Sequence, residues 1–560
     1  MHKPSLEIHT YIYMASITRE MVCGFEPSVW GDYFITYQPP PLQRSEVSLR
    51  IKAEKLKEDI CMLLNTCEDG LERITLVDSL QHLGIDHLFA EQIRTTIWDI
   101  HGTEFSSSSL HYVALQFRLL REHGIWVSTE TSVAFILADV FNNFRGKDGC
   151  FRKDITNEPK GLLSLYNAAY LFVHNEPELE EAISFARHHL EVIRGSLNSP
   201  LAEQVKRALQ VPLPRTSRRV ETLHYLSEYR KEKDYKPLIL ELAQLDFTLL
   251  RHVQLMELKD ISEWWNNLKS ICGLTYVRDR IVEAYLWSHT VFYEQSCARA
   301  RMIKAKLITL ITILDDTYDV HATIEECRLL NAAIQRWDES AISDVPEYLK
   351  MFYRELLRNF RMFEGEVAIV DKYRIDYTKK ALQNQSAYYL QEAEWVQQNH
   401  KPCFEDQVNL TSMSSAVPLL SVGMLTGMGE AITNAAFDWV ASRPDVVIAG
   451  ARIGRFLNDI AAYKRGKNSG DVESSVECYI HEHGVTDEQA FTVIYSLIED
   501  GWKTTNQARF DHGALLPAVQ RVVNAVVSMQ LYYDNGGDAY TFNMHIQEIV
   551  NKLFLEPIPM

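Results

Sequence analysis

The feature that most constrains this chain is an apolar stretch that ends abruptly in acidic residues. From Leu307 to Leu314 every residue is aliphatic except two threonines, and Asp315, Asp316 and Asp319 follow at once. The stretch is typical of a buried helix, in which Asp315 and Asp319 share one face and Asp316 lies beside them. Carboxylates placed there would repel one another and lose hydration unless a cation neutralises them.

Mg²⁺ is the cation that such an acidic cluster favours. This ion prefers carboxylate oxygen, keeps several water ligands and is often completed by the phosphates of a substrate. A solvated acidic helix end is the alternative interpretation. The D-D-x-x-D spacing alone therefore does not identify an enzyme.

Length and charge limit the classes of protein that the chain can belong to. Its 560 residues exceed what one hydrophobic core usually supports, so two domains are predicted. The formal net charge of -18 opposes attraction to nucleic acid or an anionic membrane, and neither is expected as a partner. No apolar run is expected to reach transmembrane length, because Lys304 and Lys306 precede the longest one and Asp315 follows it.

Helical periodicity predominates along the chain. Apolar residues recur at helical spacing from Leu49 to about Lys206 and again from Thr222 onward, and strand alternation is nearly absent. The clearest break is the proline-containing, basic segment 211–219. We predict an all-α protein with an N-terminal helical domain at 1–217 and a C-terminal helical bundle at 218–560. A long loop within one domain is the alternative interpretation of the break.

Two further polar clusters flank the acidic one. Arg278 and Arg280 precede it, and a pair of guanidinium groups suits the binding of a diphosphate. Arg455 and Asn458 follow it, three positions apart and so on one face of a predicted helix, which sets a phosphate donor beside a metal-binding oxygen. Each cluster taken alone is equally typical of an ordinary protein surface.

In this order and spacing the three clusters resemble those of a class I plant terpene synthase. The resemblance covers nearly the whole chain, and the other matching segments are 27–32, 78–85, 117–121, 245–247 and 538–541. It implies a helical, α-barrel-like N-terminal β domain joined to a C-terminal class I terpenoid synthase α bundle. The N-terminal domain lacks D-x-D-D, so it is expected to be structural, with the residues before Trp30 capping the active site.

The resemblance also implies a role for each motif residue. In such enzymes Mg²⁺, or Mn²⁺ in its place, joins the aspartates to the diphosphate of a linear prenyl substrate and stabilises the leaving group. The implied metal ligands are Asp315, Asp319 and Asn458, with Asp316 in support. The implied diphosphate-binding residues are Arg278, Arg280 and Arg455. The implied pocket residues are Trp287, Tyr533 and Tyr540, whose aromatic rings each stabilise a passing cation by roughly 0.5–2 kcal/mol, and Asp538, an acidic residue grouped with the tyrosines.

The second metal motif of the family is incomplete in this chain. Ala462 and Gly466 stand where a hydroxyl and a carboxylate are expected, and neither side chain can coordinate Mg²⁺. Lys464, Arg465 and Lys467 place positive charge in the same stretch. Our hypothesis is that these three basic residues hold the diphosphate directly.

The N-terminus departs from the family as well. The family often has a pair of basic residues before Trp30, whereas Glu20 and Met21 follow a single basic residue, Arg19, in this chain. In monoterpene synthases that pair is associated with isomerising the substrate. Its absence, together with the lack of an evident targeting segment, favours a cytosolic enzyme that acts on farnesyl diphosphate.

We therefore expect a sesquiterpene synthase, a carbon–oxygen lyase that ionises farnesyl diphosphate to an allylic cation, which is then cyclised or captured by water. The alternatives are a synthase of acyclic terpene alcohols or monoterpenes from geranyl diphosphate, and a prenyl-diphosphate-binding homologue impaired in catalysis. A chain-elongating prenyltransferase is disfavoured because a second full D-D-x-x-D is missing. A monomer is expected.

Overall fold

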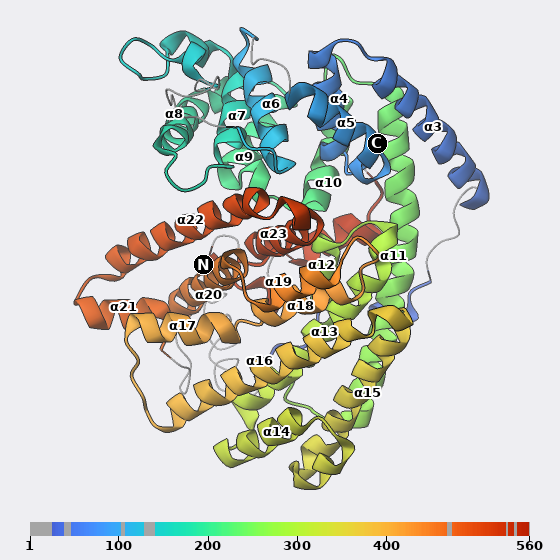
Figure 1. Cartoon of the computed structure of the whole chain (residues 1–560), viewed down its shortest axis with the longest axis vertical. Helices are drawn as coiled ribbons and strands as arrows, with labels where there is room; N and C mark the ends of the chain where they lie inside the picture. The colour runs from blue at the N-terminus through green and yellow to red at the C-terminus, as the bar shows by residue number, and fades with distance from the viewer. Residues whose placement is uncertain are drawn as a thin grey trace, which may run out of the picture.

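A computed structural model describes residues 25–38, 46–101, 107–127, 140–466, 473–533, 536–542 and 546–558. Helices stacked in two layers form the molecule, with the N-terminal domain above the C-terminal domain (Figure 1). Within the described residues there is no β-strand, and the one isolated β-bridge pairs Arg145 with Phe151. The prediction of an all-α protein is therefore confirmed.

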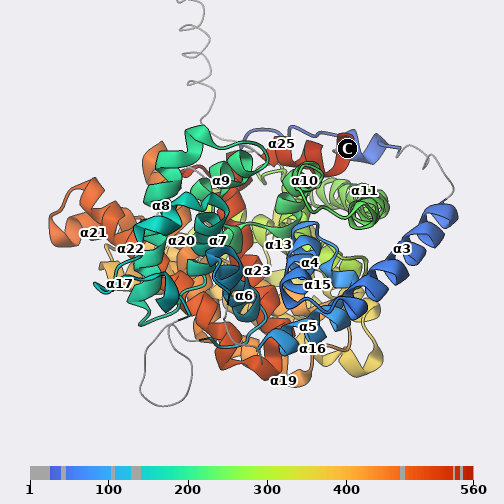
Figure 2. The same ribbon diagram turned by 90° about the horizontal axis from the view of Figure 1, so that it is seen from above.

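Seven helices form the N-terminal domain in the described ranges. They are α3 (Glu46–Thr66), α4 (Gly70–His82), α5 (Ala90–His101), α6 (Leu110–Glu122), α7 (Pro159–Ala169), α8 (Pro177–Ile193) and α9 (Leu201–Gln210). Helix α6 packs on α7, and α7 on α8, so successive helices pair as the sequence pattern predicts. Seen from above, α3 extends beyond the rest of the molecule (Figure 2).

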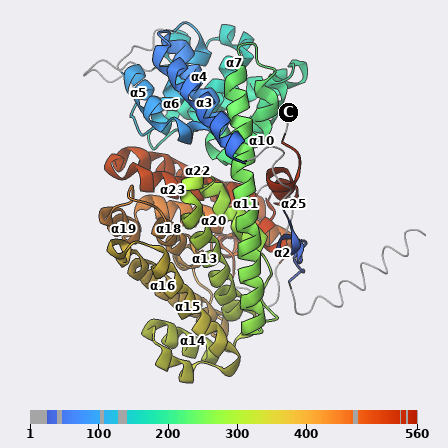
Figure 3. The ribbon, with the colours of Figure 1, turned by 90° about the vertical axis from the view of Figure 1, so that its right-hand side faces the viewer.

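The C-terminal domain is a bundle of longer helices. They are α10 (Arg218–Tyr229), α11 (Pro237–Cys272), α12 (Ile281–Val291), α13 (Ala298–Asp316), α14 (Ile324–Arg336), α15 (Lys350–Glu366), α16 (Tyr373–Gln397), α17 (Phe404–Ser414), α18 (Val417–Thr426), α19 (Asn434–Ala441), α20 (Asp445–Arg465), α21 (Ser475–His483), α22 (Asp487–Asp511), α23 (Leu516–Tyr532), α24 (Ala539–Phe542) and α25 (Ile546–Val550). The short helix α2 (Tyr33–Thr36) also packs here, against α11 (Figure 3).

Helix α11 runs through both layers of the molecule (Figure 3). Its 36 residues begin at Pro237, where a missing N–H costs nothing, and end before Gly273, whose φ of 66° suits a left-handed helix cap. The helix contacts α3 of the N-terminal domain as well as α12 and α15 of the C-terminal domain. It therefore joins the two domains through one continuous element.

Polar contacts fasten the two domains along α22. Arg215 donates to both carboxylate oxygens of Glu499, at 2.7 and 2.6 Å, and its guanidinium lies 4.7 Å from the ring centroid of Trp502. The amide of Asn506 donates to the carbonyl oxygens of Tyr170 and Phe172 at 3.0 and 2.9 Å. The predicted boundary after residue 217 falls directly before α10, which contacts helices of both domains, so that boundary stays a prediction.

Two helical stretches, Phe404–Thr426 and Gly513–Tyr532, are long and apolar enough by length and composition to cross a membrane. The expectation that no stretch reaches this length is therefore wrong. The finding carries little weight for a membrane location, because core helices of soluble proteins pass the same test. In the first stretch, 78% of the apolar window is buried within the fold.

A cavity of about 670 Å³ lies between helices α4, α6, α7 and α9 of the N-terminal domain and α10 of the C-terminal domain, and His82 is among its lining residues. The imidazole of His82 lies 3.4 Å from Asp78 and 2.8 Å from Glu221. Burial opposes the charged form of the ring, but the two carboxylates outweigh burial and raise the pKa of His82 to about 9.

This raised pKa predicts a pH-dependent contribution to stability. The contribution of His82 is fully present below its ordinary pKa of 6.5 and is lost as the pH rises through about 9. The difference in unfolding free energy between the wild type and a His82→Gln variant should therefore shrink by on the order of 3 kcal/mol over this range. Urea unfolding of both proteins at a series of pH values measures it, and a constant difference would contradict the prediction.

Candidate active site

The acidic cluster (Asp315, Asp316 and Asp319) lies where α13 changes its geometry. Residues 303–314 of α13 are all buried, as the apolar sequence predicts, and the α-helix ends at Asp316. One turn of π-helix, Thr317–His321, follows and carries Asp319. Our expectation of a regular α-helix through Asp319 is therefore wrong. Such wider turns occur often at functional sites.

Arg278 neutralises two of the three aspartates. Its backbone N–H and its Nε each donate to a different oxygen of Asp316, both at 2.8 Å, and its Nη2 donates to Asp315. The ring of Phe25 lies over the same guanidinium, 4.8 Å from its Cζ. The side chain that we predicted to bind diphosphate thus contacts one predicted metal ligand, Asp315, and its neighbour Asp316.

The third aspartate faces other carboxylates instead. Burial, followed by Asp315 and Glu392, raises the pKa of Asp319 well above its ordinary value. Burial also raises the pKa of Glu392 to about 7, although Arg455 opposes that shift. The pKa of Asp316 rises to about 6 because its burial outweighs the attraction of Arg278. Negative charge therefore exceeds positive charge on the side of the cluster away from Arg278.

Glu392 is a residue that the sequence analysis missed. It lies on α16, is buried, and accepts a hydrogen bond of 2.7 Å from the hydroxyl of Ser414. Glu392 belongs to no recognisable motif, because it is one of several acidic and aromatic residues on a long amphipathic helix. Among the described residues, no group of three or more His, Cys, Asp or Glu side chains is arranged ready to hold a metal ion.

The predicted second cluster is centred on Arg455 of α20. Its Nε donates to the carbonyl oxygen of Thr411 at 3.0 Å, and its Nη atoms donate to Asn458 and Ser414, both at 3.3 Å. The backbone of Ala416 has a φ of 64°, which separates α17 from α18 and frees carbonyl groups of α17 for these contacts. A helix break at this place agrees with the sequence pattern. Asn458 donates onward to the hydroxyl of Tyr533 at 3.4 Å.

The end of α20 contains the incomplete metal motif. The helix stops at Arg465, and Gly466 follows with a φ of 95°, a backbone conformation that favours glycine. Lys464 is exposed and lies beside Gly536, and the guanidinium of Arg465 lies 4.4 Å from the ring centroid of Phe542. Lys467 lies outside the described residues.

Arg280 and Asp538 both hold the backbone of the segment 538–542. Arg280 is buried and donates to the carbonyl oxygens of Tyr540 and Thr541 at 3.0 and 2.8 Å. Asp538 accepts from the N–H groups of the same two residues at 3.1 and 3.0 Å. The guanidinium of Arg280 is therefore engaged by carbonyl groups, and its predicted role toward diphosphate stays a prediction.

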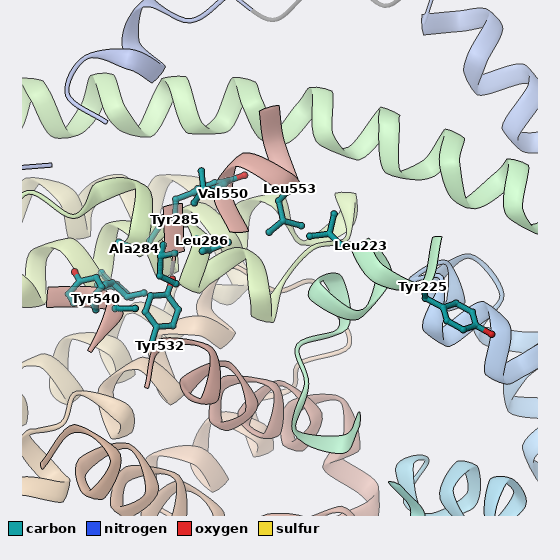
Figure 4. Close-up of a cluster of buried hydrophobic side chains, with 14 of the residues drawn as sticks. Leu223, Tyr225, Ala284, Tyr285, Leu286, Tyr532, Tyr540, Val550 and Leu553 are labelled. Carbon is teal, nitrogen blue, oxygen red and sulfur yellow. The ribbon is translucent and has the colours of Figure 1, made fainter. Parts of the chain in front are cut away.

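Three rings form an aromatic cluster (Trp287, Tyr532 and Tyr540). The rings of Trp287 and Tyr532 stack with centroids 4.2 Å apart and planes 14° apart, and Tyr540 lies 5.5 Å from Trp287. Figure 4 shows Tyr532 and Tyr540 close together beside residues of α12. The hydroxyl of Tyr540 is 2.7 Å from that of Thr312 on α13. The cluster therefore adjoins the helix that carries the acidic cluster.

Tyr532, which the sequence analysis did not name, supplies the stacked ring. Tyr533 lies beside Asn458, and its predicted place in the pocket stays a prediction. The two tyrosines are adjacent at the end of α23, so their side chains leave the helix in different directions. Helical spacing alone does not show which of the two tyrosines faces Trp287, because apolar residues lie on both faces of α23.

Comparisons with known proteins agree with this arrangement. The family model described as the terpene synthase N-terminal domain matches residues 29–209, and the one described as the terpene synthase family metal binding domain matches residues 266–504. The chain belongs to the terpene synthase family. The second match includes the acidic cluster, Arg278 and Arg455, and ends before Tyr532.

Relatives of this terpene synthase align over almost their whole length. A tau-cadinol synthase of Zea mays is 50% identical over 543 residues, which cover 96% of this chain and 98% of the relative. An alpha-copaene synthase of Zea mays is 48% identical over 546 residues, covering 95% and 99%. The structure of isoprene synthase from grey poplar leaves, Populus x canescens, with three Mg²⁺ ions and dimethylallyl-S-thiolodiphosphate, superposes with a TM-score of 0.82 at 30% identity, covering 91% and 97%.

The buried contact between Arg278 and Asp316 predicts a loss of stability when one partner is removed. An Arg278→Gln variant leaves the buried carboxylate without its counter-charge, and its unfolding free energy should fall by about 3 kcal/mol in urea titrations. Arg278→Gln combined with Asp316→Asn should regain at least half of that loss, since no buried charge remains. Arg361→Gln, which breaks the exposed pair with Glu339, serves as the control. Equal losses in the single and double variants would contradict this account.

Proposed function

We propose that this terpene synthase is a sesquiterpene synthase, which releases diphosphate from farnesyl diphosphate and yields a cyclised or water-captured product. The relatives named for tau-cadinol and alpha-copaene support a substrate of fifteen carbons. The observation that carries the proposal is the aromatic cluster bonded, through Tyr540 and Thr312, to the helix that ends in the acidic cluster. Groups for holding a diphosphate and groups for stabilising a cation thus adjoin each other.

We propose Mg²⁺ as the metal, with Mn²⁺ as an alternative. Asp315 and Asp319 would hold it together with the side-chain oxygen of Asn458, which Arg455 contacts at 3.3 Å. Glu392 adds negative charge nearby. The raised pKa values of Asp319 and Glu392, caused first by lost hydration and then by neighbouring carboxylates, support a cation at this place. When bound, the metal supplies positive charge that stabilises the departing diphosphate.

The chain contributes its own cations to the same task. Arg278 and Arg455 carry permanent charges with several N–H groups, which suit the non-bridging oxygens of a diphosphate. In this proposal Arg278 binds the diphosphate after leaving Asp315, while Asp316 keeps its bond to the Arg278 backbone. Arg280 then has a supporting role, since it holds the segment that carries Tyr540.

The aromatic cluster would receive the cation that ionisation leaves. Each ring presents a negative face, worth roughly 0.5–2 kcal/mol to a cation, and offers no strong base that would end the reaction early. Burial raises the pKa of Tyr540, so its hydroxyl stays protonated. This hydroxyl is also hydrogen-bonded to the hydroxyl of Thr312. The shape around these rings then selects the product.

We propose a monomeric enzyme. We propose a cytosolic location, because the nine cysteines are scattered along the sequence without paired spacing, as is typical of a reducing compartment. The net charge of -18 supports the absence of nucleic acid and anionic membrane as partners.

Incubation with Mg²⁺ and geranyl, farnesyl or geranylgeranyl diphosphate, followed by analysis of volatiles and released diphosphate, tests the substrate. Farnesyl diphosphate should give the highest kcat/KM. Asp315→Ala should lower that value by at least about a hundredfold, because the variant loses a charged group at the leaving group. Asp344→Ala removes an exposed carboxylate elsewhere and should leave activity unchanged. Substantial turnover by Asp315→Ala, or binding without diphosphate release by the wild type, would contradict the proposal.

The basic residues at the end of α20 require a separate test. If Lys464, Arg465 and Lys467 replace the missing metal ligands, their joint replacement by alanine should abolish turnover and raise KM for farnesyl diphosphate. A matched variant that replaces the exposed Arg361, Lys372 and Lys401 by alanine should behave as the wild type. Retained activity with an unchanged Mg²⁺ dependence in the first variant would show that these residues do not hold the diphosphate.

A further inference from the structure

The N-terminal segment 25–38 lies on the C-terminal domain, beside α11 (Figure 3). Trp30 and Phe34 are its buried anchors, with 8% and 1% of their surfaces exposed. Phe25 of the same segment lies on the guanidinium of Arg278, 4.8 Å from its Cζ. The segment therefore touches the residue that neutralises the acidic cluster.

Trp30 makes one specific polar contact with the domain on which it lies. Its indole Nε1 donates to Oε1 of Glu283 at 3.1 Å. Glu283 lies on α12 and is fully buried, and its Oε2 has no hydrogen-bond partner among the described residues. Loss of the indole would leave a buried carboxyl group with neither oxygen bonded to a side chain, which is costly.

The backbone of Glu283 contacts the aromatic cluster. Its carbonyl oxygen accepts a hydrogen bond of 2.7 Å from the hydroxyl of Tyr532, whose ring stacks on Trp287. Trp287 follows Glu283 by four positions on α12 and therefore lies on the same face of the helix. Figure 4 shows Tyr532 beside α12. One buried residue thus contacts the N-terminal segment on one side and the aromatic cluster on the other.

We propose that Glu283 is a positioning residue that locks the N-terminal segment to the aromatic cluster, with its side chain holding Trp30 and its carbonyl group holding Tyr532. This inference rests on the proposed function, because the lock keeps the segment closed over a site where water would capture the cation. The lock needs a hydrogen-bond acceptor at Oε1 and does not need a full negative charge. Burial in fact raises the pKa of Glu283 to about 7.

Three variants separate the lock from other effects. Glu283→Gln keeps an acceptor oxygen, Glu283→Leu removes it at similar volume, and Trp30→Phe removes the donor while keeping a ring. Tyr33→Phe changes a half-exposed ring of the same segment and serves as the control. Circular dichroism verifies that each variant is folded, and Trp30→Phe still tests the contact if Glu283→Leu does not fold.

Hydrogen exchange of the metal-free, full-length protein tests the lock without any substrate. The amides of Tyr33 and Thr36, which bond to the carbonyls of Trp30 and Asp32, report on the segment. Glu283→Leu and Trp30→Phe should each speed their exchange at least tenfold, and the double variant should add little. Glu283→Gln and Tyr33→Phe should stay within twofold of the wild type. The lock would be overturned if either Glu283→Leu or Trp30→Phe left the amide exchange rates of Tyr33 and Thr36 unchanged. It would also be overturned if the increases from the two substitutions added in the double variant.

The product mixture from farnesyl diphosphate and Mg²⁺ tests what the lock protects. In Glu283→Leu and Trp30→Phe the fraction of water-captured alcohols should rise at least twofold, while Glu283→Gln keeps the wild-type fraction. The positioning role would be overturned if the fraction of water-captured alcohols stayed unchanged in a variant whose segment 25–38 shows faster amide exchange. If the wild type forms no product at all, the proposed function fails, and the exchange experiment still decides whether Glu283 locks the segment.

Discussion

The repulsion among carboxylates at the end of a buried helix is the constraint on which the rest of this site depends. Without positive charge beside them, Asp315 and Asp316 would destabilise the end of α13. Arg278 meets that need from the connection between α11 and α12, and it is held there by Asp316, Thr541 and the ring of Phe25. Four distant parts of the chain therefore meet around one guanidinium group.

Much of the architecture could be predicted, because long apolar-periodic segments leave few alternatives. Helices α13, α15, α16, α20 and α23 lie within the stretch from Thr222 onward in which apolar residues recur at helical spacing, and the break near Pro418 follows from the conflict between a proline and a continuous helix. The motif residues could be found because the arginine pair, the acidic cluster and the Arg455–Asn458 cluster follow one another in the order and spacing typical of the family.

Other parts of the site were outside the reach of sequence patterns. Glu392 carries no motif, and its proximity to Asp319 arises from how α16 packs on the π-helical turn. The stacking of Tyr532 on Trp287 depends on the direction in which each side chain leaves the last turn of α23, which helical spacing alone does not settle. Arg280 reads like a ligand-binding residue, yet it binds backbone carbonyls, because a short segment such as 538–542 cannot satisfy its own polar groups.

The length of α11 has a mechanical consequence. A helix of 36 residues spans roughly 54 Å at 1.5 Å per residue, and it packs against both domains, so a hinge between them would have to bend or break its backbone hydrogen bonds. The two layers thus move as one body, and access to the acidic cluster cannot come from their opening. The segments 25–38 and 536–542, which contact Arg278 through Phe25 and Thr541, are pieces of chain beside the acidic cluster that can shift without bending α11.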